Sequence, residues 1–154
     1  AESKVKNELK HSPSDNHEMP GGLCFPLYAC SREIIKRYTP FLEKIDLTYT
    51  QYIAMMVLWE KKQISVKELG KCLFLDSGTL TPLLKKLEQK GYVTRTRSEE
   101  DERVLIAAIT PKGEDLKDEA VLIPQKMMAC AALPQEKAAQ LYTLLYELLN
   151  TLEK

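Results

Sequence analysis

Residues 64–93 read ISVKELGKCLFLDSGTLTPLLKKLEQKGYV and contain two short helical patterns separated by a few residues. Ser65 is expected to cap the first helix, because a glutamate follows three residues later and completes a capping box. Asp76 or Ser77 is expected to cap the second helix, and Gly91 to follow its end in a left-handed conformation. Two short helices joined in this way predict a helix-turn-helix.

Each of the two helices has one apolar face. The apolar positions recur three or four residues apart, which is typical of a helix packed on a core. They are Val66, Leu69, Cys72 and Leu73 in the first helix, and Leu80, Leu83, Leu84 and Leu87 in the second. Cys72 is therefore expected to be a structural residue.

The period of the pattern changes to two after the second helix. The segments YVTRTRS at 92–98 and RVLIAAIT at 103–110 resemble strands, with the acidic EEDE at 99–102 between them. A β-hairpin directly after a helix-turn-helix is a wing. Thr110 and Pro111 then predict the cap and first residue of another helix.

Residues 1–22 are polar and are expected to form a flexible leader. A helix is predicted over about 23–45, and Pro40 is expected to bend it or end its first part. Thr48 or Thr50 is expected to cap a buried helix that follows.

Both ends of the chain are more apolar than a small winged domain can bury. The last helix repeats leucine at helical spacing, at Leu141, Leu144, Leu145, Leu148, Leu149 and Leu152. This stripe could be core within one chain, but a dimer interface formed by residues 23–45 and 112–154 is favoured. Pro124 is expected to interrupt the second of these segments. The predicted fold is mainly α with a small β-wing, in one domain over 23–154 whose helix-turn-helix and wing span about residues 64–110.

The totals restrict the class of protein. At 154 residues the chain allows one domain with a core, and its net charge of zero weighs mildly against a nucleic-acid partner. No segment approaches the roughly 20 apolar residues of a membrane span, and no cleavable signal opens the chain. The four cysteines are widely spaced, and the histidines are His11 and His17 in the leader, so neither metal nor cofactor is expected. A cytoplasmic protein with reduced thiols is expected.

The second helix of the helix-turn-helix turns hydroxyl and lysine side chains away from its leucines. Such side chains suit phosphates and base edges in a major groove. The candidates are Ser77, Thr79, Thr81, Lys85 and Lys86. The alternative is a capped helix whose polar face is only solvated.

The predicted wing adds Arg95, Arg97 and Arg103. Arg103 is expected near the tip, where a guanidinium can enter a minor groove. Asp101 is expected to orient Arg103 as its ion-pair partner, whereas the three glutamates of the loop are unfavourable beside DNA. Arginines in a hairpin can also be merely exposed, but together with the helix-turn-helix and the leucine stripe they favour DNA binding.

The cysteines at positions 24 and 30 are expected to have separate roles. Six residues on a helix correspond to about 240° around the axis and about 9 Å along it, which excludes a disulfide between them. Cys24 lies at the helix start, where backbone N–H groups and the helix dipole favour a thiolate. Cys30 lies further in and is expected to be a small buried residue.

Residues 75–113, LDSGTLTPLLKKLEQKGYVTRTRSEEDERVLIAAITPKG, resemble the helix-turn-helix and wing of the MarR family of winged-helix repressors. The most recognisable part is DER, followed by a strand and IT-x-x-G. LCFPLYACSRE at 23–33 and LTYTQY at 47–52 are similar to the organic hydroperoxide resistance regulators of that family. The likeness covers about residues 23–124 and continues more weakly beyond them.

This resemblance implies a homodimeric repressor that binds an inverted-repeat operator and leaves it when an organic hydroperoxide oxidises a cysteine. The sensing cysteine would be Cys24. Tyr38 and Tyr49 match the tyrosines that hydrogen-bond its thiolate, one of them from the other subunit, and Tyr28 matches a further pocket tyrosine. Oxidation in such regulators ends in a mixed disulfide with a small thiol or in an intersubunit disulfide. Cys130 is the candidate partner for the latter, unless it is an interfacial cysteine without a redox role.

Two other functions stay open. The dimer could release DNA on binding a small aromatic or phenolic ligand between its helices, with Cys24 only lining the pocket. A thiol peroxidase is less expected, because the chain has no catalytic histidine and no CxxC motif. A regulator rather than an enzyme is therefore predicted.

Overall fold

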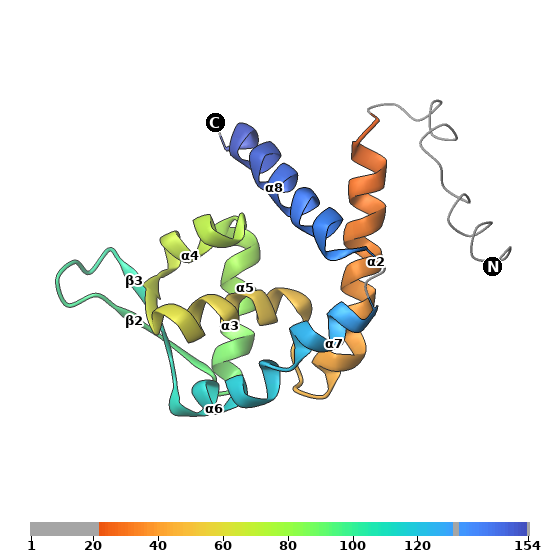
Figure 1. Cartoon of the computed structure of the whole chain (residues 1–154). Coiled ribbons are helices and arrows are strands. Elements are labelled where there is room, and N and C mark those ends of the chain that lie inside the picture. The colour runs from red at the N-terminus through yellow and green to blue at the C-terminus, as the bar shows by residue number, and fades with distance from the viewer. Residues whose placement is uncertain (1–21, 131–132, 154) are drawn as a thin grey trace, which may run out of the picture.

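The structure is a computed structural model that describes residues 22–130 and 133–153, so residues 1–21 of the expected leader lie outside it. Figure 1 shows the β2–β3 hairpin extending from one side of the molecule, whereas α2 and α8 stand on the other side. The elements are α2 (Cys24–Glu43), α3 (Tyr49–Lys61), β1 (Gln63–Ser65), α4 (Val66–Leu73), α5 (Ser77–Gln89), β2 (Val93–Arg97), β3 (Leu105–Ile109), α6 (Pro111–Ala120), α7 (Ile123–Cys130) and α8 (Gln135–Leu152). The predicted helix-turn-helix, formed by α4 and α5, and the predicted wing, formed by β2 and β3, are confirmed.

The helix starts follow the predicted caps. Ser65 accepts a hydrogen bond from the backbone N–H of Glu68 at 3.1 Å, but the Glu68 side chain lies 3.6 Å from Lys71 Nζ and does not complete the predicted capping box. Asp76, not Ser77, caps α5. Thr48, not Thr50, caps α3 and forms a complete capping box with Gln51. These short polar side chains replace the missing partners of the first helical amides.

One strand escaped prediction. The sheet has the order β1-β3-β2 with antiparallel pairs, and its edge strand β1 has three residues, with Ile64 opposite Ala107. Three residues are too few to display an alternating pattern, so only pairing with β3 identifies this strand.

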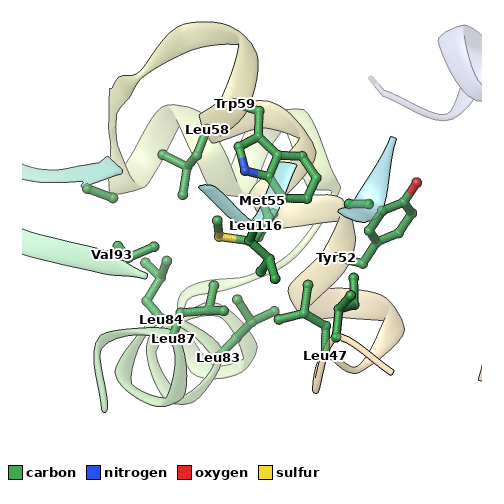
Figure 2. Packing of buried hydrophobic residues seen from close by; sticks show 14 of the residues in the cluster. Leu47, Tyr52, Met55, Leu58, Trp59, Leu83, Leu84, Leu87, Val93 and Leu116 are labelled. Atoms are coloured by element: carbon green, nitrogen blue, oxygen red, sulfur yellow. The ribbon is translucent and has the colours of Figure 1, made fainter. Parts of the chain in front are cut away.

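The core lies where α3 crosses the helix-turn-helix (Figure 2). Met55 and Leu58 of α3 are fully buried and belong to one cluster with Leu84 and Leu87 of α5 and Val93 of β2. Burial of these side chains is the main stabilising contribution, roughly 1.5–3 kcal/mol for each large one. The second helix of the helix-turn-helix, α5, which we call the reading helix, is therefore held by its leucine face.

Gly113 lets α6 approach the base of the wing closely. A Cβ at this position would overlap the carbonyl oxygen of Tyr92 and stand 2.9 Å from a side-chain carbon of Ile109. The Gly113 carbonyl also accepts a hydrogen bond from the buried Trp59 indole Nε1 at 2.8 Å. Only glycine fits here, and α6 is thereby seated on both the wing and α3.

Of the two outcomes expected at Pro40, a bend or an end of the first part of the helix, the end does not occur. α2 continues through Pro40 to Glu43. Proline removes the hydrogen bond to the carbonyl of Lys36, but that residue is exposed, so water can satisfy the carbonyl. The interruption expected at Pro124 does occur, because α6 ends at Ala120 and Pro124 is tolerated in the first turn of α7.

The expected burial of Cys30 is also wrong within one chain, and Cys72, predicted as a structural residue on the apolar face of its helix, is exposed as well. Cys72 lies roughly 60° around the axis of α4 from the buried Leu69, at the edge of a narrow apolar stripe. Cys30 lies in the N-terminal half of α2, whereas the buried residue of that helix, Leu42, lies near its other end.

The described residues of α8 include no buried side chain. Leu141, Leu144, Leu145 and Leu152 are 45%, 60%, 38% and 69% exposed, so the predicted leucine stripe is present and uncovered within one chain. Over the described ranges, no helix combines the length and apolar character that crossing a membrane requires.

Candidate functional site

The outward face of α5 carries the predicted DNA-contact residues. Its leucines are at most 7% exposed, which leaves the polar residues at the surface. Thr81 and Lys85 project from the side opposite the leucines, whereas Ser77 and Thr79 flank the first turn. All five candidates are exposed: Ser77, Thr79, Thr81, Lys85 and Lys86.

Asp76 orients the start of this helix. Its Oδ1 accepts the backbone N–H of Thr79 at 2.8 Å, and this hydrogen bond lowers the pKa of the Asp76 carboxyl below its ordinary value. The ionised cap holds the first turn of α5 in a defined geometry. The hydroxyls of Ser77 and Thr79 are therefore presented on an ordered helix start.

The arginines of the wing differ in their surroundings. Arg95 has a side chain only 20% exposed, and its Nε and Nη2 donate to Glu88 Oε1 at 3.0 and 2.9 Å. This pair holds β2 against α5. A DNA contact of Arg95 stays a prediction, while Arg97 is exposed at the end of β2.

Arg103 is oriented as predicted by Asp101. The guanidinium donates from Nε to Asp101 Oδ1 at 3.1 Å, and the backbone N–H of Arg103 donates to the same oxygen at 3.0 Å. These bonds, the side-chain one first, lower the pKa of the Asp101 carboxyl. The Arg103 side chain is still 90% exposed, so it projects from the turn that joins β2 to β3.

Cys24 is the first residue of α2 and is exposed. The N-cap residue Leu23 makes no side-chain hydrogen bond to the helix start. One turn later the hydroxyl of Tyr28 accepts a hydrogen bond from Arg32 Nη1 at 3.3 Å, and the Arg32 guanidinium lies 5.6 Å from the Tyr28 ring centroid. Because this hydroxyl accepts from Arg32, its own proton is free for another acceptor.

Tyr38 and Tyr49 lie in contact within one chain, with ring centroids 5.1 Å apart. Tyr52 completes a group with centroids 5.9 Å from Tyr38 and 6.5 Å from Tyr49, which we call the tyrosine trio. Tyr38 stands fourteen residues, or about 21 Å, along α2 from the Cys24 of its own chain. The division of Tyr38 and Tyr49 between two subunits is therefore wrong: a thiol that touches both must come from another chain.

Burial raises the pKa of all three phenols in the trio, and charge repulsion from neighbouring tyrosines adds to the effect at Tyr38 and Tyr52. The phenols consequently remain protonated at neutral pH. A protonated phenol is a hydrogen-bond donor, which can stabilise a thiolate without a basic residue nearby. Among the described residues, no cluster of His, Cys, Asp or Glu could hold a metal ion.

Cys130 ends α7, but its side chain lies outside the described part of the chain. α7 packs on the C-terminal half of α2, where Lys126 Nζ lies 5.8 Å from the centroid of Phe41. Phe41 is about 26 Å along α2 from Cys24. The second cysteine thus belongs to a region remote from the Cys24 of its own chain.

Sequence reasoning missed three members of this region. Tyr52 was assigned only to an apolar run, although its spacing of three from Tyr49 places both on one side of α3. Gln51 and Lys90, which bond to each other at 3.1 Å, are 39 residues apart in the chain. No local pattern reveals such a pair, because folding alone brings its members together.

The sequence is similar to known transcriptional regulators. Residues 36–120 match the family described as transcriptional regulator SarA/Rot. The organic hydroperoxide resistance transcriptional regulator of Bacillus subtilis (strain 168) is 47% identical over 150 residues, which are 97% of this chain and 99% of that protein.

The fold is similar to that of the regulator AbfR of Staphylococcus epidermidis. Reduced AbfR bound to DNA superposes with a TM-score of 0.72 at 32% identity, over 93% of this chain and 100% of that one. A disulfide-formed AbfR superposes with a TM-score of 0.59 at 32% identity, over 98% of this chain and 96% of that one. Overoxidised AbfR bound to DNA superposes with a TM-score of 0.71, so the present arrangement is more similar to the DNA-bound forms of AbfR than to the disulfide-formed one.

Proposed function

Since the chain belongs to the MarR family of winged-helix transcriptional regulators, in which it groups with the organic hydroperoxide resistance regulators, we propose that it is a repressor that senses peroxides through Cys24. The reduced homodimer binds an inverted-repeat operator, and oxidation releases it. The observation that carries this proposal is the placement of Cys24, which lies at the open start of α2, far from a trio of protonated tyrosines that a second chain can reach.

In the proposed dimer the thiolate of one chain lies against Tyr38 and Tyr49 of its partner. Both hydroxyls donate to the sulfur, and Tyr28 adds a donor from the same chain as Cys24. The positive end of the α2 dipole points at the same atom. These groups together favour the ionised, nucleophilic form of the thiol.

The proposed sensing step is nucleophilic attack on a peroxide. The Cys24 thiolate bonds to the terminal oxygen of the hydroperoxide, and the O–O bond breaks. The alkoxide leaves and takes up a proton as the alcohol, so the peroxide is reduced while the sulfur is oxidised to a sulfenic acid. An apolar rim suits an alkyl hydroperoxide, since Leu23 and Phe25 beside Cys24 are 67% and 45% exposed.

The sulfenic acid then condenses with a second thiol and loses water to give a disulfide. We propose Cys130 of the partner as that thiol. The remoteness of α7 from the Cys24 of its own chain supports a bond between chains, and a disulfide-formed state is known for AbfR. A small cellular thiol is the alternative, and the two products differ in mass.

Dimer formation is part of the proposal, because one α5 and one wing cover only half of a palindromic operator. The uncovered leucines of α8 and the exposed apolar residues of α2 supply the surface. Two α5 helices then present Thr81 and Lys85 to successive major grooves, and Arg103 lies over the adjoining minor groove. As a regulator of this kind it has no catalytic turnover, and it works in the cytoplasm, where the DNA lies.

The test uses the full-length dimer and an operator duplex. One equivalent of cumene hydroperoxide is expected to release the wild-type protein, with a Cys24–Cys130 linked dimer on non-reducing electrophoresis and in intact mass. Cys24→Ser should bind the operator and stay bound after treatment, whereas the matched variant Cys30→Ser should behave like wild type. If Cys24→Ser still dissociates on treatment with peroxide, the sensing assignment fails.

A second candidate signal is a small aromatic ligand. An open, largely apolar pocket of about 300 Å³ lies between α3 and the α6–α7 segment, with Tyr52 of the trio in its wall. The other lining residues include Met56, Trp59, Lys117 and Val121. Release of DNA by a phenolic carboxylate with no change in protein mass would favour this candidate, and a Met56→Trp variant that fills the pocket should then abolish the response.

A further inference from the structure

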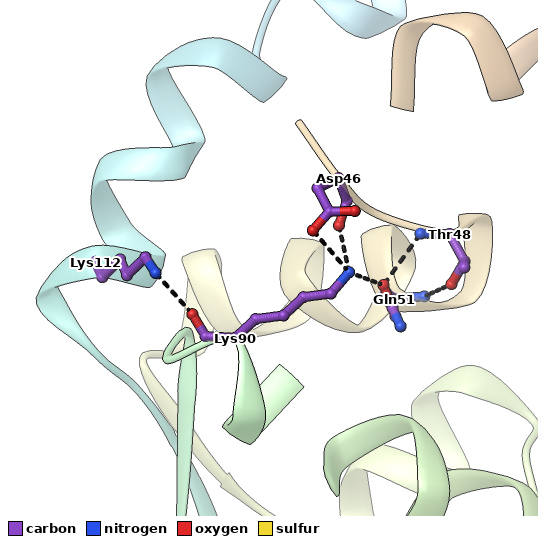
Figure 3. Close-up of polar contacts among 5 residues, drawn as sticks. All are labelled: Asp46, Thr48, Gln51, Lys90 and Lys112. Atoms are coloured by element: carbon purple, nitrogen blue, oxygen red, sulfur yellow. Dashed lines mark hydrogen bonds and ion pairs between the residues drawn. The ribbon is translucent and has the colours of Figure 1, made fainter. Parts of the chain in front are cut away.

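The end of the reading helix is tied to the corner between α2 and α3 by a single lysine (Figure 3). Lys90 is the C-cap residue of α5, and its Nζ donates to Gln51 Oε1 at 3.1 Å. The same ammonium donates to the backbone carbonyl of Asp46 and lies 3.5 Å from Asp46 Oδ2. One side chain thus joins α5 to two points of the corner.

Gln51 makes this tie specific. It is 3% exposed and is the buried polar side chain among the described residues. Its Oε1 also accepts the backbone N–H of Thr48 at 3.1 Å, while its own backbone N–H donates to Thr48 Oγ1 at 3.3 Å. A buried amide oxygen costs free energy unless it is hydrogen-bonded, so Lys90 and the capping box depend on each other.

The same corner forms one wall of the tyrosine trio. Tyr49 directly follows Thr48 in the chain, and Tyr52 directly follows Gln51. The two residues of the capping box are therefore covalently joined to two of the three aromatic rings. A displacement of the Tyr49 backbone would shift Thr48 and disturb the Thr48–Gln51 bonds, and it would reach Lys90 through Gln51 Oε1.

The end of α5 is held from the other side as well. Lys112 of α6 donates from Nζ to the Lys90 carbonyl at 2.9 Å and lies 5.3 Å from the centroid of the Tyr92 ring. Tyr92 directly precedes β2, the first strand of the wing. The position of Lys90 consequently affects the orientation of both the reading helix and the wing.

We propose that Lys90 is a positioning residue that couples the tyrosine trio to the reading helix, a role that rests on the proposed function. In the reduced dimer, the intact capping box holds Lys90 and so holds α5 and the wing in the DNA-binding orientation. Oxidation of the partner's Cys24 displaces Tyr49, opens the Thr48–Gln51 box and frees Lys90. Apolar packing holds α5 against α3, and the directional polar bonds of Lys90 favour one tilt of α5 within that packing.

The test compares Lys90→Met, which keeps the side-chain length but removes the ammonium, with the wild-type dimer. Operator affinity is measured before and after one equivalent of cumene hydroperoxide, and intact mass confirms equal oxidation of Cys24. Reduced Lys90→Met is expected to bind DNA at least tenfold more weakly than the reduced wild type, because the bonds that hold α5 in its DNA-binding orientation are already absent. Its ratio of oxidised to reduced dissociation constants should fall at least tenfold below the wild-type ratio.

Two further variants separate coupling from a general loss of charge. Lys62→Met removes the ion pair with Glu114, 2.8 Å long, at the opposite end of α3 from the corner, and should keep the wild-type ratio. Lys90→Arg retains a cation and should recover most of the ratio. An unchanged ratio in Lys90→Met, with Cys24 fully oxidised, overturns the proposal.

A second measurement does not depend on peroxide. Amide hydrogen exchange at residues 86–92 is followed in the reduced dimer after Tyr49→Ala, in the wild-type and in the Lys90→Met background. The proposal expects Tyr49→Ala to speed exchange at these residues in the first background and to have little effect in the second. Equal effects in both backgrounds overturn the coupling role. Failure of the wild-type dimer to release DNA on oxidation would instead contradict the proposed function, and the exchange result still decides the role of Lys90.

Discussion

Leucine side chains differ in exposure between two regions of the chain. One region is the DNA-reading half, α3 to α6 with the sheet, and the other is the terminal helices, α2 and α8. Leu58, Leu84 and Leu87 of the reading half are 0% exposed, whereas Leu23, the N-cap residue of α2, and Leu152 of α8 are 67% and 69% exposed. The reading half closes its core within one chain. α8 also has leucines at helical spacing and α2 has other exposed apolar residues, but nothing in the described part of one chain buries them, and the proposed dimer would cover them.

This difference agrees with the location of the proposed Cys24 sensor. A region that is complete only in the dimer can bring Cys24 of one chain to the trio of the other. The reading half buries the leucine face of α5 in its own core, and Asp101 orients Arg103 on the wing. The join between the two regions is the corner at Thr48–Gln51, which belongs to both.

The largest effect is expected from a charge in the leucine stripe of α8. Leu145→Asp should convert the dimer to a monomer, because an unpaired carboxylate in an apolar interface costs several kcal/mol. Operator affinity should fall by at least ~100-fold, since one α5 then replaces two. Sedimentation velocity and fluorescence anisotropy measure both. Asn150→Asp, on the opposite side of α8, is the matched control, and a Leu145→Asp variant that stays dimeric would contradict the proposed interface.

A cavity in the reading half should act on folding instead. Leu84→Ala removes a fully buried side chain and is expected to lower the free energy of unfolding by about 3 kcal/mol in urea titrations. Leu144→Ala, from a side chain 60% exposed within one chain, should weaken dimer formation and leave the unfolding of a dissociated monomer nearly unchanged. Equal losses in the monomer for both variants would remove the distinction between the two regions.

A smaller effect is expected at the wing. Arg103→Ala should weaken operator binding about tenfold and reduce the salt dependence of binding by about one phosphate contact, without lowering Tm. Arg95→Ala should instead lower Tm, because this arginine joins β2 to Glu88 of α5. Competition binding at several salt concentrations and thermal unfolding distinguish a DNA contact from a structural one.

The smallest effect is a pH dependence at the join. The pKa of each phenol in the trio is raised in the folded chain, so the folded state holds these protons more tightly than the unfolded state does. The resulting stability is fully present below the unfolded pKa of about 10 and is lost as pH rises through the folded pKa. Urea titrations between pH 8 and 11 should show this decline, and Tyr49→Phe should make it shallower. A stability that rises over this range would contradict the burial of the trio.

Local chemistry was sufficient to predict the reading half. Ser65, Asp76, Thr110 and Gly91 act within a few residues of themselves, so the helix-turn-helix and wing could be placed without knowledge of the rest of the molecule. The three-residue β1 and the exposure of Cys72 escaped, because pairing with β3 and the narrow packing of α4 are set by distant residues.

The sequence by itself also determined that Cys24 begins a helix and that α8 carries an uncovered stripe, since both follow from helical periodicity. Only the tertiary structure decided that Tyr38, Tyr49 and Tyr52 form one group and that this group lies far from the Cys24 of its own chain. The tie between Lys90 and Gln51 was likewise decided by folding. Helical spacing determines which residues share a face, whereas contacts between residues tens of positions apart depend on how the helices pack against each other.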